Sequence, residues 1–142
     1  MLCLRLRDGV RLWKTYARPR PGARGAVLLR GEPLFLRDGF GERVIVGGND
    51  GMVRAFDAES GRLMWSYDAG APVRCLPLPV QSSGRSALLV SCDGPRVWLL
   101  DAQTGEALRE IRTDGATSFA PLPWKNTFYV ATADGSIEKF RF

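Results

Sequence analysis

Aspartate recurs at regular intervals in this sequence and is the residue type best suited to chemistry. The pairs Asp50-Gly51, Asp93-Gly94 and Asp134-Gly135 are spaced by 43 and 41 residues. Repeated carboxylates can bind calcium or act as general acids. No segment has the dense Asp/Asn spacing of a calcium loop, however, and Asp-Gly is a strong signal for a hairpin turn. We therefore expect these residues to be structural repeat positions that cap turns.

Other residue types that support catalysis or metal binding are scarce. The sequence has no histidine, which removes the commonest general base and metal ligand. Cys3, Cys75 and Cys92 are far apart and show no zinc-site spacing. Cys75 and Cys92 fall within apolar runs, so we expect them to behave as buried small hydrophobic residues. We therefore expect no catalytic residue, no metal site and no cofactor.

The positive charge comes mainly from arginine. The 142 residues carry a net charge of +5, and arginine can bind phosphate through two hydrogen bonds at once. The densest basic group is a candidate contact patch in "ARPRPGARGAVLLRG", formed by Arg18, Arg20, Arg24 and Arg30. It lacks the interleaved aromatic residues on which single-stranded bases stack. We therefore expect a solvated basic surface, and nucleic-acid binding is kept as a second alternative function.

The strands and turns that position the aspartates recur along the sequence. A second turn recurs 44 residues apart, as "DAESG" at 57–61 and "DAQTG" at 101–105. A period in the low forties with short strands inside it is typical of propeller blades. The first unit is predicted to have strands at 32–38, 43–48, 52–58 and 62–68. The second is predicted to have strands at 72–79, 87–92, 96–102 and 106–112, and the third at 117–123, 127–133 and 136–142.

The first residues contain part of another unit. The segment "LCLRLRDGVRLWKTYA" aligns with "MVRAFDAESGRLMWSYDA", so Trp13 and Trp65 share one repeat position, as do Gly61 and Gly105. We expect the two tryptophans to pack between blades.

The repeat predicts one all-β domain over residues 1–142, built of four-stranded antiparallel propeller-type blades. It divides into a partial blade at 1–17, an irregular connection at 18–31, blades at 32–70 and 71–114, and an incomplete blade at 115–142. About three blades make an open arc or part of a larger propeller, because closed propellers have about four to eight blades.

The segment "VIVGGNDGMVRAFDAESGRLMWSYDAG", residues 44–70, resembles the repeat of the quinoprotein (PQQ-like) β-propellers. That repeat typically has a short apolar strand, an Asp-Gly turn, "LYALD", "TGK" and "LLW". The match is fair over residues 87–112 and weaker over 127–140. The resemblance implies a β-propeller. The family that it indicates includes quinone-dependent dehydrogenases, outer-membrane assembly scaffolds and repeats attached to larger enzymes.

Three functions are weighed. We favour a non-catalytic protein-interaction scaffold, completed by a second copy of the chain or by a protein partner, because rigid propeller rings bind proteins through loops and edges. The alternative is part of a PQQ-dependent dehydrogenase. The resemblance implies that such an enzyme binds PQQ and calcium on the propeller axis, with a catalytic aspartate and often a paired-cysteine disulfide, and this sequence has no adjacent cysteines. Nucleic-acid binding is the second alternative.

The location of the protein is predicted from two features. No apolar stretch is long enough to span a membrane, and the first ten residues carry charges from Arg5 onward, unlike a signal peptide. We therefore expect a cytoplasmic protein without a membrane span.

Overall fold

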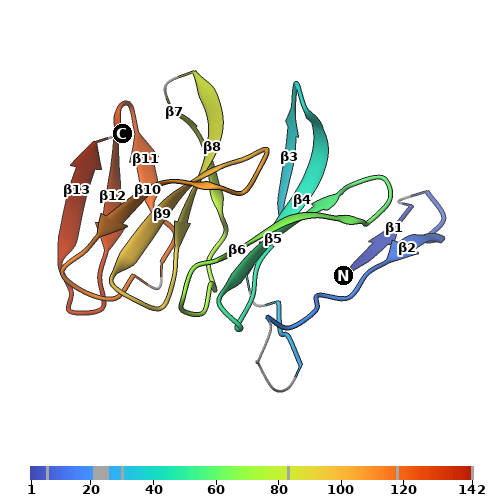
Figure 1. Cartoon of the computed structure of the whole chain (residues 1–142), viewed down its shortest axis with the longest axis horizontal. Helices are drawn as coiled ribbons and strands as arrows, with labels where there is room; N and C mark the ends of the chain where they lie inside the picture. Colours follow the sequence, from blue (N-terminus) through green and yellow to red (C-terminus); the bar gives the residue numbers. More distant parts are fainter. Residues whose placement is uncertain (6, 21–25, 30, 83, 118, 142) are drawn as a thin grey trace.

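The chain folds as a row of antiparallel β-sheets. The computed structural model describes residues 1–5, 7–20, 26–29, 31–82, 84–117 and 119–141. Within them there are thirteen strands and no helix, arranged as sheets of two, four, four and three strands. The sheets stand side by side in chain order and form an open arc (Figure 1). The predicted all-β, propeller-type architecture is confirmed.

In every sheet, strands that are neighbours in sequence pair with each other. The N-terminal hairpin consists of β1 (Leu2–Leu4) and β2 (Arg11–Lys14). The first complete sheet consists of β3 (Leu34–Asp38), β4 (Gly41–Gly47), β5 (Met52–Asp57) and β6 (Leu63–Asp68). The second consists of β7 (Leu78–Ser82), β8 (Arg85–Ser91), β9 (Arg96–Asp101) and β10 (Ala107–Arg112). The third consists of β11 (Leu122–Trp124), β12 (Thr127–Ala131) and β13 (Ile137–Arg141).

The turn between the third and fourth strands is the same in both complete sheets. The carboxylate of Asp57 accepts a hydrogen bond from the backbone N–H three residues later at 2.7 Å, and that of Asp101 does so at 2.9 Å. Gly61 and Gly105 have φ angles of +70° and +76°. Glycine adopts this conformation without the steric cost that a Cβ brings, so the turn requires it at both positions.

The Asp-Gly pairs adopt two different turns. Gly51 and Gly135 have φ angles of +81° and +89°, as the hairpin signal predicts. Gly94 does not have a positive φ, and its N–H donates to the carbonyl oxygen of Cys92 at 2.6 Å. Pro95 follows Gly94, and proline favours an extended conformation in the residue before it. The Asp-Gly pair therefore does not form the same turn in every repeat.

The first strands of the second and third sheets begin later than predicted. They were expected at 72–79 and 117–123, whereas β7 begins at Leu78 and β11 at Leu122. The preceding segments hydrogen-bond to neighbouring sheets instead. The N–H of Val73 donates to the Gly48 carbonyl at 3.0 Å, and that of Thr117 donates to the Gly94 carbonyl at 3.0 Å. These segments therefore connect one sheet to the next.

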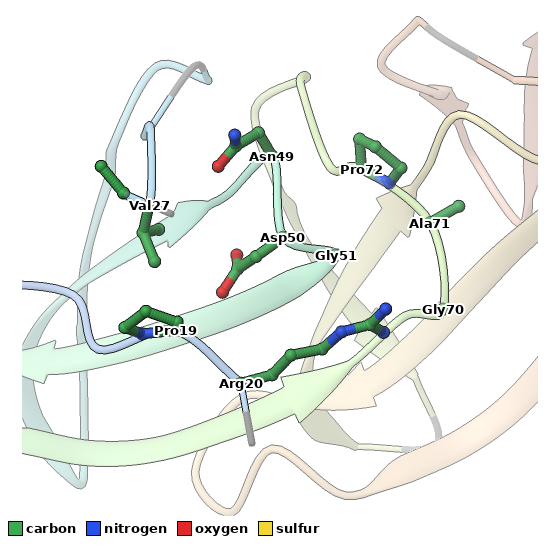
Figure 2. Close-up of a pocket in the computed structure, with 10 residues that line it drawn as sticks. Pro19, Arg20, Val27, Asn49, Asp50, Gly51, Gly70, Ala71 and Pro72 are labelled. Atoms are coloured by element: carbon green, nitrogen blue, oxygen red, sulfur yellow. The ribbon is translucent and has the colours of Figure 1, made fainter. Parts of the chain in front are cut away.

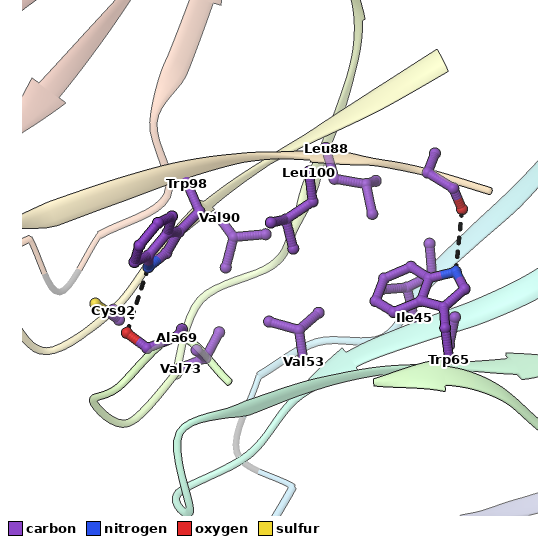
Figure 3. Packing of buried hydrophobic residues seen from close by; sticks show 12 residues of the cluster. Ile45, Val53, Trp65, Ala69, Val73, Leu88, Val90, Cys92, Trp98 and Leu100 are labelled. Atoms are coloured by element: carbon purple, nitrogen blue, oxygen red, sulfur yellow. Dashed lines mark hydrogen bonds between the residues drawn. The ribbon is translucent and has the colours of Figure 1, made fainter. Parts of the chain in front are cut away.

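Two apolar clusters hold adjacent sheets together. The larger lies between the two complete sheets, where Ile45 and Val53 face Leu88, Val90 and Leu100 (Figure 3). The second lies between the second complete sheet and the third sheet, and its fully buried members include Leu89, Phe128 and Val130. Burial of such aliphatic and aromatic side chains is the main stabilising contribution to the stack.

Candidate interaction surfaces

Trp65 joins the two complete sheets. It lies on β6 and is 8% exposed. Its indole N–H donates to the carbonyl oxygen of Ala102 at 3.2 Å, drawn as a dashed line in Figure 3. Its ring covers Gly105 so closely that a Cβ placed on that glycine would lie 2.4 Å from the ring. A tryptophan of one sheet thus packs on the turn of the next sheet.

Trp13 makes the same contacts one sheet earlier. Its indole N–H donates to the carbonyl oxygen of Ala58 at 3.0 Å, and a Cβ on Gly61 would lie 2.6 Å from its ring. The sequence showed the tryptophans and the glycines as two separate repeat positions. The structure brings each tryptophan onto the glycine of the following sheet, so both positions form the joints between sheets.

Arg43 is a buried contact that the sequence analysis missed. Its side chain is fully buried and donates to the carbonyl oxygen of Ala102 at 2.7 Å and to the carboxylate of Asp38 at 2.9 Å. Ala102 therefore accepts hydrogen bonds from both Arg43 and Trp65. The sequence held one signal for this contact, an arginine at the start of an apolar strand. A charge that is buried there needs hydrogen-bonding partners from neighbouring elements.

Asp50 forms a buried ion pair with Arg54. Their side chains are 7% and 3% exposed, and Arg54 also donates to the carbonyl oxygen of Arg18 at 2.6 Å. Burial by itself would raise the pKa of Asp50, but the hydrogen bond and charge of Arg54 outweigh it, so the pKa lies below its usual value. Asp50 is therefore held ionised as part of the framework.

The remaining repeat aspartates have local partners. Asp93 forms an ion pair with Arg74 at 2.5 Å. The hydroxyl of Thr132 donates to Asp134 at 2.5 Å and holds the pKa of that carboxyl below its usual value. Among the described residues, no three His, Cys, Asp or Glu side chains converge as metal ligands.

The candidate arginine patch is only partly within the described residues, because Arg24 and Arg30 lie outside them. Arg20 pairs with the carboxylate of Asp68 at 3.4 Å. Arg20 also lines a hollow of about 250 Å³, with Asp50 and Gly51 on the opposite side (Figure 2). Arg18 is exposed, and its carbonyl oxygen accepts from Arg54. Both described arginines thus contact the first complete sheet.

Apolar side chains are exposed at both ends of the arc. On the N-terminal hairpin these are Leu2, Leu4 and Leu12. The outer face of the third sheet exposes Leu122, Trp124 and Ile137, which are 66%, 62% and 75% exposed. Large exposed apolar patches mark surfaces that pack against another element or protein. The two ends of the arc are therefore candidate surfaces for packing against a further sheet or a partner.

Comparison with known proteins identifies the family. A family profile described as outer membrane protein assembly factor BamB matches residues 2–74 and again 49–141. The chain belongs to the BamB family of PQQ-like repeat proteins. BamB from Burkholderia pseudomallei (strain K96243) is 32% identical over 120 residues, and BamB from Moranella endobia (strain PCIT) is 26% identical over 103 residues.

These alignments cover 78% and 68% of this chain but 29% and 26% of the relatives. The chain therefore spans less than a third of the length of these BamB proteins. A crystal structure of BamB from Moraxella catarrhalis superposes with a TM-score of 0.61 and 21% identity, covering 80% of this chain and 34% of that one. This likeness supports the propeller fold. The names of these relatives describe an assembly factor and no enzyme.

The prediction of a cytoplasmic protein is wrong. Both curated relatives are outer membrane protein assembly factors, so the work of this family belongs at the outer membrane. The prediction depended on the first residues of the given sequence. Because this chain spans under a third of the length of these relatives, its first residues are no guide to location. In the described part of the chain, no helix is long and apolar enough to cross a membrane.

Proposed function

We propose that this chain is a non-catalytic protein-interaction scaffold that takes part in the assembly of outer membrane proteins. The observation that carries the proposal is membership of the BamB family, because the relatives are named as outer membrane protein assembly factors. The tryptophan joints stiffen the arc, and a rigid surface binds with less loss of conformational entropy.

Each end face is completed by protein: a partner, a second copy of the chain, or further blades of a larger propeller. Unpaired strand edges and apolar faces favour such association. Within the chain, we keep the division into a partial blade at 1–17, a connection at 18–31, blades at 32–70 and 71–114, and an incomplete blade at 115–142. The tryptophan joints between successive units support these boundaries.

Depletion of the chain in the cell that encodes it tests the role. The amount of folded outer membrane protein should fall, as measured by heat-dependent gel mobility, and re-expression of the chain should restore it. Light scattering on the purified chain tests completion by a second copy, which requires a dimer at micromolar concentration. Unchanged outer membrane protein together with a compact monomer that binds no protein would contradict the proposal.

A further inference from the structure

A hollow of about 340 Å³ lies between the two complete sheets, at the β3–β4 and β9–β10 turns. Phe40 lines it from the first complete sheet, and the second sheet with its turns contributes Arg85, Glu106 and Leu108. The blades of a propeller stack face to face around a ring. Further sheets would therefore pack on the outer faces at the two ends of the arc, and they would leave this hollow between two complete sheets as it is.

The β3–β4 turn holds an aromatic side chain in solvent beside the hollow. Phe40 is 62% exposed, and its backbone N–H donates to the carboxylate of Asp38 at 2.9 Å, which fixes the turn. Leu108 lines the same hollow from β10 and is 41% exposed. Aromatic and aliphatic side chains that line one hollow form a site for an apolar side chain of a binding partner.

The buried side chain of Arg43 connects the two walls of the hollow. It donates to the carboxylate of Asp38, which holds the turn of Phe40, at 2.9 Å. It also donates at 2.7 Å to the carbonyl oxygen of Ala102, in the β9–β10 turn that lines the other side. One fully buried residue therefore fixes both walls in place. A surface that is fixed before binding loses little conformational entropy when a partner docks.

Two charged side chains of opposite sign line the hollow without a partner. Arg85 and Glu106 are both exposed, and neither forms an ion pair within the described part of the chain. Asp101 also lines the hollow, but its carboxylate already accepts the backbone N–H groups of Gln103 and Thr104 at 2.8 and 2.9 Å. The hollow therefore presents a cation and an anion beside its apolar residues.

The size and charge of the hollow determine its occupant. At about 340 Å³ it is near the lower limit of the about 300–1,000 Å³ typical of small-molecule and cofactor pockets, which suits one large side chain. A second copy of the chain would bring the same concave surface and leave the hollow unfilled, whereas stable interfaces are complementary in shape. A polypeptide segment with an apolar side chain between an acidic and a basic residue would fill the hollow and compensate both charges.

We propose that this hollow docks one large apolar side chain from an exposed segment of a partner protein, flanked in that segment by an acidic and a basic residue. Phe40 and Leu108 contact the apolar side chain, Arg85 pairs with the acidic residue and Glu106 pairs with the basic residue. This inference rests on the proposed scaffold function and specifies one surface and the chemistry of its partner.

Binding of synthetic peptides tests the proposal. The probes are two end-blocked peptides, Asp-Gly-Phe-Gly-Lys and Lys-Gly-Phe-Gly-Asp, and their controls have serine in place of phenylalanine. Titration of the isotope-labelled chain, followed by NMR, should show saturable shifts at the amides of Phe40, Arg85 and Glu106 with one of the two probes, and binding should weaken as salt rises. The inference is overturned if neither probe gives saturable shifts at millimolar concentration, or if the serine controls bind equally well.

Exchange of the two charges locates the site. Arg85→Glu and Glu106→Arg should each weaken binding of the preferred peptide by about ten-fold, because each replaces attraction with repulsion. The double variant should regain binding, but for the peptide with the opposite order of charges. Arg62→Glu makes the same charge change at an exposed arginine next to β6, outside the hollow, and binding should stay within about two-fold. Equal losses in Arg62→Glu and Arg85→Glu, or a double variant that keeps the original preference, would refute the assignment.

Phe40→Ser separates binding from folding. Because Phe40 is exposed, the melting temperature should stay about the same while peptide affinity falls by at least about five-fold. Phe35→Ser is the matched control on β3, where the ring is 56% exposed, and affinity should stay within about two-fold. Unchanged affinity in Phe40→Ser, or a dimer of the chain that dissociates on this substitution, would overturn the inference. If the peptides fail to bind while depletion still lowers folded outer membrane protein, only this inference fails and the scaffold function stands.

Discussion

Substitution of Gly105 by alanine tests whether the tryptophan joint holds the sheets together. The new methyl group would lie 2.4 Å from the ring of Trp65, so the ring would have to retreat by about 1 Å to reach ordinary contact distance. That movement also lengthens the hydrogen bond from Trp65 to Ala102, which is 3.2 Å long. The substitution should therefore destabilise the chain through both the backbone and the packing.

The loss of unfolding free energy caused by Gly105→Ala has three contributions. An alanine at a φ of +76° costs about 1–2 kcal/mol. Overpacking against the indole ring of Trp65 costs about 1–3 kcal/mol, and a weakened hydrogen bond costs about 1 kcal/mol. The expected loss for Gly105→Ala is about 3–6 kcal/mol, comparable to the loss expected for Trp65→Ala. Since domains are stable by about 5–15 kcal/mol, this loss is large.

Gly84 provides a matched control. It also has a φ of +76°, but a Cβ there would meet nothing within 4 Å. Gly84→Ala should therefore cost only the backbone contribution, about 1–2 kcal/mol. Urea denaturation followed by circular dichroism measures both losses, and Trp65→Leu combined with Gly105→Ala should recover part of the packing contribution. If Gly105→Ala is no more destabilising than Gly84→Ala, the packing of the Trp65 ring on Gly105 does not hold the two sheets together.

Two further predictions concern charge. Asp50→Ala should lower the free energy of unfolding, measured by urea denaturation, by about 3–5 kcal/mol, because it leaves Arg54 buried without its partner. Asp68→Ala removes an exposed ion pair and should lower it by less than about 1 kcal/mol. Equal losses in the two variants would contradict the buried ion pair. Hydrogen bonds from Ser60 hold the pKa of Asp57 below its usual value, so its contribution to stability is complete above about pH 5 and is lost as pH falls below about 4. Melting temperatures from pH 6 to pH 3 should therefore drop in the acid range, and less steeply in Asp57→Asn; identical profiles would refute this cause.

Local sequence patterns predicted the features that depend on local chemistry. The turns at Asp57 and Asp101 were expected from their spacing, and they form because a carboxylate and a glycine within five residues specify the turn. The Asp93-Gly94 pair was expected to match Asp50-Gly51. It does not, since the following Pro95 changes the allowed conformations.

The contacts between sheets could not be derived in this way. The sequence indicated that Trp65 and Gly105 are repeat positions, but it carried no information that one lies on the other, because their separation in space depends on how the sheets stack. The burial of Arg43 was missed for the same reason, since its acceptor is on a different sheet.

Two of the tryptophan contacts run forward along the chain, and one runs back. Trp13 contacts the turn that contains Ala58 and Gly61, and Trp65 contacts the turn at Ala102, whereas Trp98 on β9 donates to the earlier carbonyl oxygen of Ala69 at 3.3 Å. Trp13 and Trp65 are therefore synthesised about 40 residues before the acceptors they need. During translation, the N-terminal hairpin and the first complete sheet each leave an exposed indole until the next sheet folds against it. At these two joints, each added sheet thus secures the one before it.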